Sequence, residues 1–384
     1  MKKLILSIMA IMALTFTGCS DDDDTQDNAF VVDQNNFVGE IPFGDNIVLE
    51  AKKYKLTGAL IVKEGATLTI PAGAVIEANQ ADGSATTVRY IAVERGAKIN
   101  INGTTDKPVV MTSEVKAASS WGGLVICGAA PHNVGGGEAL AEVSGLSYGG
   151  TKADDNSGSI THLRIEYTGY KYSDTKEFNG VSLFGVGSGT KFEYVTSYKG
   201  GDDGIEFFGG SVNGKYLLSI DSEDDGIDFA DGWNGTGEYW FVRNALKSSI
   251  EGSNNGSNGN ATPMTNATLK NLTLIGSGEK PFYFKEGAGK QSVDNVIIGG
   301  ATASKGAYFY ADAESKDAPA YARLVAGDLK ITNVKFMDDV VAKMWDSRLV
   351  VTEKSDATGA GNGVNRPSWV SDAMNSIGTG VVIF

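Results

Sequence analysis

A short run of alternating apolar and acidic residues occurs twice in the middle of the chain. The phrase DDGIEF at 202–207 returns as DDGIDF at 224–229, 22 residues later. Its alternation predicts a strand with Ile205 and Phe207 on one face and Glu206 on the other. A fixed period of this length with glycine corners is typical of a solenoid. We therefore expect Ile227 to lie on Ile205 and Asp228 beside Glu206, with the carboxylates in a column on the exterior.

The same repeat extends on both sides of this phrase. NGVSLF at 179–184 matches the next copy at a shift of 24 residues, and LKNLTLIG at 269–276 matches VDNVIIGG at 293–300 at the same shift. Residues 58–77 contain three short alternating runs with turns at Gly65 and at 71–73, so one coil has three strands. This pattern predicts an all-β fold, a single-stranded parallel β-helix with three corners per coil.

The repeat has limits that define the expected organisation. We expect an N-terminal cap over residues 31–57, the β-helix over 58–337 and a C-terminal cap over 338–384. The C-terminal cap would contain short helices near 340–350 and 366–378 and a last strand at 381–384. Two long loop insertions, 129–158 and 251–267, lack a strand pattern and are expected on one face, where solenoids often bind ligands.

The acidic residues of the repeat are the main candidates for a metal site. Like charges on neighbouring strands repel each other, so something should relieve them: Lys199, turn amides, raised carboxylate pKa values or a cation. Calcium prefers six to eight oxygen ligands. The alternative is structural, in which each aspartate accepts bonds from the amides of its own turn. The candidate calcium ligands are Asp202, Asp203, Glu206, Asp224, Asp225 and Asp228.

Catalysis by this region is a second possibility. Glycosidases use two carboxyl groups that flank a sugar bond, and Glu206 and Asp228 on adjacent coils are candidates, although they are expected to lie close together. A lyase would also need a base, for which Lys199 is one candidate. The chain has two histidines, and it contains no zinc motif, nucleophile elbow or phosphate loop. No complete catalytic set is therefore evident.

The N-terminus predicts export. Lys2 and Lys3 precede a short apolar run, which is typical of a cleaved signal peptide over residues 1–18. The sequence FTGC at 16–19 resembles a bacterial lipobox, which implies lipidation of Cys19. Residues 19–30 are polar and acidic and are expected to form a flexible linker. The formal charge of −14 argues against nucleic acid as a partner.

Two phrases resemble a known group of proteins. WGGLVICGAAPHN at 121–133 and the repeated DDGI phrase, with Trp233, are similar to sequences of uncharacterised Bacteroidetes surface lipoproteins. These have the right-handed parallel β-helix of the pectin-lyase-like type. SDDDD at 20–24 also resembles the signal that directs lipoproteins of this phylum to the outer face of the outer membrane.

The resemblance implies a lipid-anchored protein exposed on the cell surface. We expect a non-catalytic module that binds a glycan or an outer-membrane protein partner and that is stabilised by calcium. The alternative is a polysaccharide lyase or a glycoside hydrolase that uses the acidic column.

Overall fold

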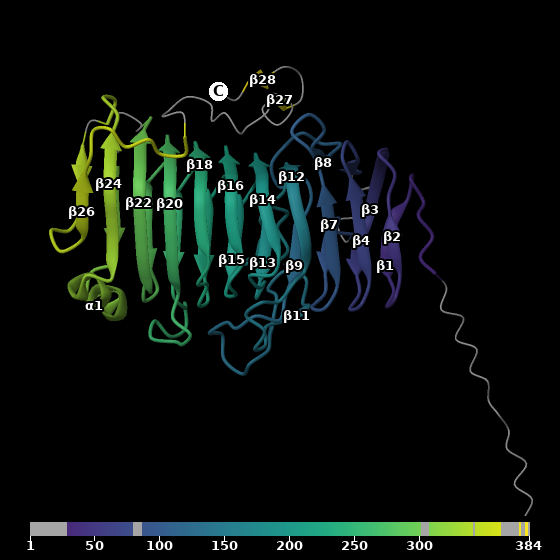
Figure 1. The fold of residues 1–384 in the computed structure, drawn as a ribbon, viewed down its shortest axis with the longest axis horizontal. Helices are drawn as coiled ribbons and strands as arrows, with labels where there is room; N and C mark the ends of the chain where they lie inside the picture. The colour runs from purple at the N-terminus through teal and green to yellow at the C-terminus, as the bar shows by residue number, and fades with distance from the viewer. Residues whose placement is uncertain are drawn as a thin grey trace, which may run out of the picture.

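The computed structural model describes residues 29–79, 87–300, 307–340, 342–361, 376–377 and 381–382. Its strands stack in one long sheet in which all neighbouring strands are parallel (Figure 1). Parallel crossover connections are right-handed in nearly all proteins. The predicted fold class is confirmed: the chain is mostly β, and its sheet is that of a right-handed parallel β-helix. Cys19, the predicted signal peptide and nearly all of the acidic linker lie outside the described residues.

The coil has three faces, which we call A, B and C. Face A begins with β1 and the second half of β3. It continues with one short strand from each later coil, each paired in parallel with the strand of the coil before it. Its members are β1 (Phe37–Ile41), β3 (Lys53–Val62), β6 (Tyr90–Val93), β9 (Leu124–Cys127), β13 (Val181–Phe184), β15 (Ile205–Phe208), β17 (Ile227–Ala230), β19 (Ser248–Ser253), β21 (Lys280–Lys285), β23 (Ala307–Ala311) and β25 (Lys343–Met344).

Faces B and C share long strands in the second part of the chain. Face B begins with β2 (Asn46–Val48), β4 (Thr67–Pro71) and β7 (Lys98–Asn102), and face C with the first half of β3, β5 (Val75–Ala78) and β8 (Val109–Ser113). From then on most strands cross both faces: β12 (Gly158–Glu166), β14 (Lys191–Tyr198), β16 (Asn213–Ile220), β18 (Thr236–Arg243), β20 (Asn266–Ile275), β22 (Lys290–Gly299) and β24 (Leu329–Phe336), before β26 (Val350–Glu353).

One left-handed residue bends each long strand between faces B and C. These corner residues have φ between 52° and 61° and are His162, Tyr194, Tyr216, Tyr239, Asn271, Asn295 and Asn333. Because the corners stack, so do their side chains. The ring centroids are 4.3 Å apart for His162 and Tyr194, 4.5 Å for Tyr194 and Tyr216, and 5.0 Å for Tyr216 and Tyr239. The rings are nearly parallel, with interplanar angles of 5°, 16° and 11°, and such stacked pairs add to the stability that burial provides.

The interior of the coil is apolar throughout. Ile205, Phe207, Ile227 and Phe229 are fully buried, as the alternating pattern predicts. Trp233 lies 4.7 Å from the ring of Phe207 and 5.2 Å from that of Phe229. Its indole nitrogen donates to the carbonyl of Val212 at 3.1 Å, so the one polar atom of this large side chain is satisfied inside the core.

The strands at both ends of the solenoid pair with the neighbouring coil. β1 and β2 pair in parallel with β3 and β4, so residues 37–48 supply the first strands of the ladder. At the C-terminal end, the prediction of a helix at 340–350 is wrong. Residues 343–344 form β25 on β23 and residues 350–353 form β26 on β24, because backbone pairing with the preceding coil continues there.

The remaining elements are short. The helix α1 (Ala318–Ala326) is absent from the sequence-based expectation; the carboxylate of Asp317 caps its N-terminus, and Gly327 ends it in the left-handed conformation. Hairpins form from β10 (Ala139–Leu140) with β11 (Ser147–Tyr148) and from β27 (Ser376–Ile377) with β28 (Val381–Val382). The helix expected at 366–378 falls largely outside the described residues. Among the helices described, none is long and apolar enough to cross a membrane.

Candidate metal site

The two copies of the acidic phrase stack in the predicted register. Ile205 pairs with Ile227 and Glu206 with Asp228, and on the preceding side Val181 pairs with Ile205 and Ser182 with Glu206. The outward column on face A therefore reads Ser182, Glu206, Asp228. The expectation that the column is exterior needs correction, since Glu206 is only 9% exposed and Asp228 only 7%.

The first excursion, residues 129–158, explains this burial. Beside the acidic column, face A carries a second outward column that is apolar, in which the rings of Phe184 and Phe208 stack at 4.1 Å. Ala141, Val143 and Tyr148 of the excursion pack on these rings and on Cys127. The excursion thus has an apolar underside of its own, and it closes over the outer face of the strands.

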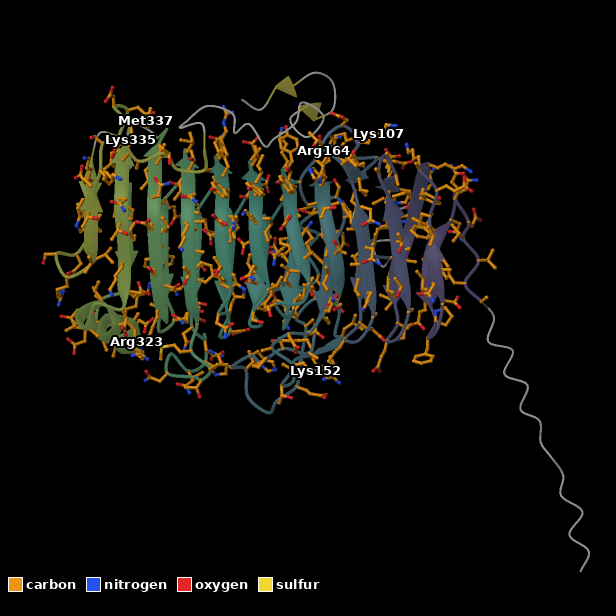
Figure 2. The ribbon with its side chains drawn as sticks, in the orientation of Figure 1. Lys107, Lys152, Arg164, Arg323, Lys335 and Met337 are labelled. Carbon is orange, nitrogen blue, oxygen red and sulfur yellow. The ribbon has the colours of Figure 1, made fainter. Side chains whose placement is uncertain are left out.

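The first excursion meets the second excursion, which is the loop insertion at residues 251–267, through buried asparagines. The side-chain amide of Asn133 donates to the carbonyl of Asn254 at 3.0 Å, and that of Asn255 donates to the side-chain oxygen of Asn133 at 3.1 Å. Arg323 of α1 donates to Asn260 in the second excursion at 2.8 Å. Figure 2 labels Lys152 of the first excursion and Arg323 of α1, and both lie along the same edge of the solenoid (Figure 2). The loops therefore form a continuous border beside face A.

The predicted acidic residues form two overlapping groups. Oxygen atoms of Asp203, Glu206 and Asp228 lie within 4.8 Å of one another, and so do oxygen atoms of Asp202, Asp203 and Asp224. Asp203 belongs to both groups. We call the first, fully buried group the inner trio and the second the outer trio. Asp225 belongs to neither.

A structural role accounts for part of this set. Asp203 accepts the backbone N–H of Asp225 at 2.8 Å, and Asp225 accepts that of Ser248 at 2.5 Å. Each aspartate thus caps the equivalent residue of the next coil. Asp228 also accepts a backbone N–H, that of Phe229, at 2.5 Å. A structural role therefore exists for these aspartates, although Asp203 and Asp225 bond to the next coil and not to their own turn, and Glu206 accepts no backbone amide among the described residues.

Burial and mutual repulsion act strongly on the trios. Desolvation, followed by the charge of Asp225, raises the pKa of Asp203 well above its usual range, and desolvation and Asp228 do the same to the pKa of Glu206. Desolvation raises the pKa of Asp228 to about 7, and desolvation together with Asp224 raises that of Asp202 to about 8. Without a cation, these groups hold protons near neutral pH.

Basic side chains form no ion pair with the inner trio among the described residues, although the charge of Lys285 opposes the rise in the pKa of Asp228. Lys247 lies 2.6 Å from Asp224 in the outer trio, and Lys285 pairs with Glu251 on the next coil. Lys199, one of the candidates to relieve the charge, is exposed and places its ammonium 5.3 Å from the ring centroid of Tyr198. Among the described residues, no ion pair reaches Asp203, Glu206 or Asp228.

An open polar cavity leads to the trios. It has a volume of about 480 Å³, and more acidic than basic residues line it. Its charged lining residues are Glu142, Asp174, Lys176, Glu177, Asp202, Glu223, Asp224 and Lys247. Because Asp202 and Asp224 belong to both the lining and the outer trio, a cation that enters the cavity meets the outer trio, which shares Asp203 with the inner trio.

Asn179 is a further candidate ligand that the sequence did not reveal. Its amide nitrogen donates to Glu206 at 2.5 Å, and its side-chain oxygen is buried without a hydrogen-bond partner in the part of the chain that the structure describes. It precedes Asp203 by 24 residues, so the repeat itself was the available signal. Carboxylate and amide oxygens are the ligands of hard cations. The buried acidic clusters can therefore bind a metal ion.

A family model described as a pectate-lyase-like β-helix domain matches residues 39–374. The chain belongs to this family. Comparisons with curated proteins and with solved structures found no match. As a member of the pectate-lyase-like β-helix family, the chain has the fold that the sequence repeat predicted, whereas the fold by itself does not assign an activity.

The catalytic alternative gains little from the geometry. The oxygens of Glu206 and Asp228 lie within 4.8 Å, and glycosidases separate their two carboxyl groups by about 5 Å or more to admit the sugar and water. Lys199, the third candidate, does not reach them. Both carboxylates are also buried and do not line the cavity, which suits an ion better than a polysaccharide.

Proposed function

We propose that this pectate-lyase-like β-helix is a calcium-binding, non-catalytic module that presents a rigid surface to a glycan or to an outer-membrane protein partner. In this proposal Cys19 carries the lipid anchor, and the protein lies on the outer face of the outer membrane. The acidic charge disfavours nucleic acid. The rigid β-helix would serve as a scaffold, and its excursions would form the binding surface.

One observation carries the calcium proposal. The inner trio places three buried carboxylates within 4.8 Å of one another and shares Asp203 with the outer trio, whose other members line an acidic cavity, and no lysine or arginine of the described residues forms an ion pair with the inner trio. Burial of several like charges is unfavourable unless they are protonated or bind a cation. Calcium fits better than magnesium, which requires near-ideal octahedral geometry and retains water.

Calorimetry on the chelator-treated protein tests the proposal. Calcium at about 100 times its dissociation constant should stabilise the fold by about 2.7 kcal/mol and raise Tm by about 3 °C. Glu206→Gln and Asp228→Asn should remove most of this rise. The matched control is Glu193→Gln, an outward glutamate on β14 that is paired with Lys191 at 3.3 Å, which should keep it. An unchanged Tm of the wild-type protein with calcium at pH 8 would contradict the proposal.

A second measurement tests the non-catalytic part. Uronate-containing and neutral polysaccharides are incubated with the calcium-loaded protein, and products are followed by absorbance and by chromatography. We expect no turnover. Product formation that is lost in Glu206→Gln would instead support the lyase or hydrolase alternative.

A further inference from the structure

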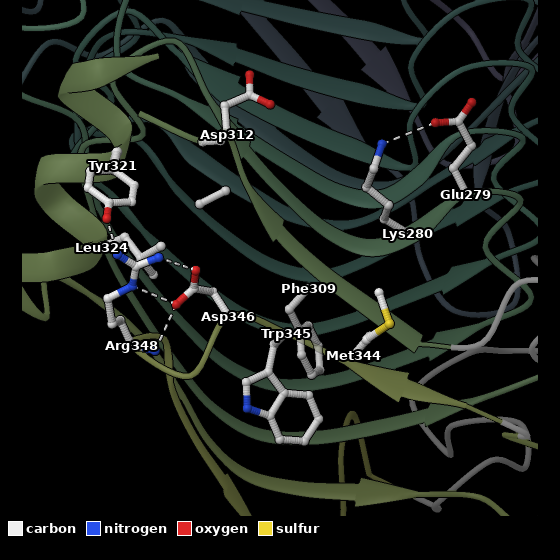
Figure 3. Close-up of a pocket in the computed structure, with 12 residues that line it drawn as sticks. Glu279, Lys280, Phe309, Asp312, Tyr321, Leu324, Met344, Trp345, Asp346 and Arg348 are labelled. Atoms are coloured by element: carbon white, nitrogen blue, oxygen red, sulfur yellow. Dashed lines mark hydrogen bonds and ion pairs between the residues drawn. The ribbon is translucent and has the colours of Figure 1, made fainter. Parts of the chain in front are cut away.

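A second cavity lies at the C-terminal end of the solenoid, away from the acidic column. Its volume is about 480 Å³, and it is bounded by α1, β23, the end of β25 and the segment after it (Figure 3). Its apolar lining residues are Phe309, Ala311, Ala313, Leu324, Met344 and Trp345. This volume is in the range of pockets that bind small ligands.

Aromatic rings form the floor of this cavity. The rings of Trp345 and Phe336 stack with centroids 6.2 Å apart at 4°, and the ring of Phe309 lies 5.5 Å from that of Trp345. Phe309 is also the last ring of the inner core column that contains Phe282, at 5.6 Å. Trp345 is therefore held against the end of the core, and it remains half-buried.

Fixed charged pairs stand on two sides of the floor. Arg348 donates to both carboxylate oxygens of Asp346, at 2.8 Å and 2.6 Å, and also to the hydroxyl of Tyr321. Across the cavity, Lys280 pairs with Glu279 at 3.2 Å. Figure 3 shows the two pairs on opposite sides of Trp345 and Phe309. These partly exposed pairs present donors and acceptors on two sides of the aromatic floor.

The charges in the lining nearly balance. Two basic residues, Lys280 and Arg348, face three acidic ones, Glu279, Asp312 and Asp346. The cavity therefore has no surplus of positive charge with which to attract an anion, and the chain as a whole carries −14. An apolar acyl chain would use the aromatic floor and leave the charged pairs without a role.

We propose that this end cavity binds a neutral sugar residue of a glycan. The C–H face of a pyranose ring packs on Trp345, and its hydroxyls bond to Asp346, Arg348 and Glu279. The proposal rests on the glycan-binding form of the proposed function and locates that binding at a site separate from the metal trios. Such a ring uses both the apolar floor and the polar pairs, whereas an acyl chain uses only the floor. A uronate adds a carboxylate, for which the lining has no surplus of positive charge.

Binding of defined oligosaccharides tests this site. Neutral gluco-, manno-, galacto- and xylo-oligosaccharides, an oligogalacturonate and a fatty acid are titrated into the full chain by calorimetry. We expect one neutral oligosaccharide to bind about tenfold more tightly than the oligogalacturonate and the fatty acid. Trp345→Ala should weaken it about tenfold or more, since aromatic anchors dominate such contacts.

Further variants separate binding from folding. Asp346→Asn keeps the shape of the rim but should weaken the neutral sugar several-fold, and Trp345→Phe should retain part of the affinity. Tyr172→Ala, an aromatic residue that is 48% exposed and remote from the cavity, is the matched control and should bind normally. Neutral-sugar binding that persists in Trp345→Ala would overturn this site while leaving the proposed function intact. Tighter binding of the fatty acid or the oligogalacturonate would overturn it too.

Loss of calcium stabilisation is measured separately. If Glu206→Gln abolishes the calcium effect and sugar binding is unchanged, both sites stand as distinct. If calcium has no effect on the wild-type protein but a neutral sugar binds through Trp345, the metal proposal fails and the end cavity stands.

Discussion

Two columns of this molecule obey the same stacking rule with opposite consequences. At the corner between faces B and C, the rings of Tyr194, Tyr216 and Tyr239 lie 4.5 Å and 5.0 Å apart and attract one another. On face A, the same translation brings Glu206 onto Asp228, and these groups repel each other. A solenoid therefore repeats, from coil to coil, the attraction or repulsion between equivalent side chains.

The difference indicates which column needs an external partner. Rings satisfy each other, and the edges of the stack remain half-exposed to solvent. Buried carboxylates cannot satisfy each other unless a proton or a cation lies between them. The corner column is thus a source of stability, whereas the acidic column makes stability depend on pH and on metal.

The largest expected effect is a pH dependence of the metal-free protein. In the native state, the pKa of Asp228 is about 7 and that of Asp202 is about 8, whereas an unfolded aspartate has a pKa of about 4. Between these values the native state binds more protons, so the free energy of unfolding falls as pH rises from about 5 to 8. We expect Tm to fall by about 5 °C or more over this range.

Calcium and mutation sharpen this result. Calcium should restore the lost stability at pH 8 and add little at pH 5, where protons occupy the carboxylates. Asp228→Asn should flatten the dependence on pH in the absence of metal. A Tm that stays constant or rises between pH 5 and 8 in the chelator-treated protein would show that the acidic column is not strained.

A smaller effect is expected from breaking the ring stack. Tyr216→Ala removes two ring contacts at once, each worth about 0.5–1.5 kcal/mol beyond the buried area. We expect the free energy of unfolding to fall by about 2 kcal/mol in urea titrations, with no change in the calcium effect. Tyr216→Phe keeps the rings and should lose much less. If both variants lose the same amount, the hydroxyl rather than the stack is responsible.

The smallest effect is expected at Asp225. Its carboxylate accepts the amide of Ser248 and lies outside both trios. Asp225→Asn keeps an acceptor oxygen, so calcium affinity measured by calorimetry should change less than about threefold and Tm should stay within about 2 °C. A loss of calcium binding as large as that of Asp228→Asn would place Asp225 among the ligands and would merge the two groups.

Much of the fold and the position of the site could be predicted from the sequence. The repeated phrase placed Ile227 on Ile205 and Asp228 beside Glu206, because strand pairing in a solenoid translates a sequence period directly into contacts. It also assembled five of the six acidic candidates into groups that can hold a metal. The error at residues 340–350 arose because an apolar period over so short a segment does not distinguish a helix from a strand.

Other features depend on contacts between segments without a period. Whether the carboxylates face solvent was decided by the excursion at 129–158, whose apolar residues meet Phe184 and Phe208 only after the coils have stacked. The end cavity around Trp345 likewise could not be predicted from the repeat. The sequence by itself thus determined the coil, the register and the column of like charges, since these follow from local alternation and a fixed spacing. Only the tertiary structure decided which oxygens are buried, which are already bonded and which remain to bind an ion, because loops and chain ends obey no spacing rule.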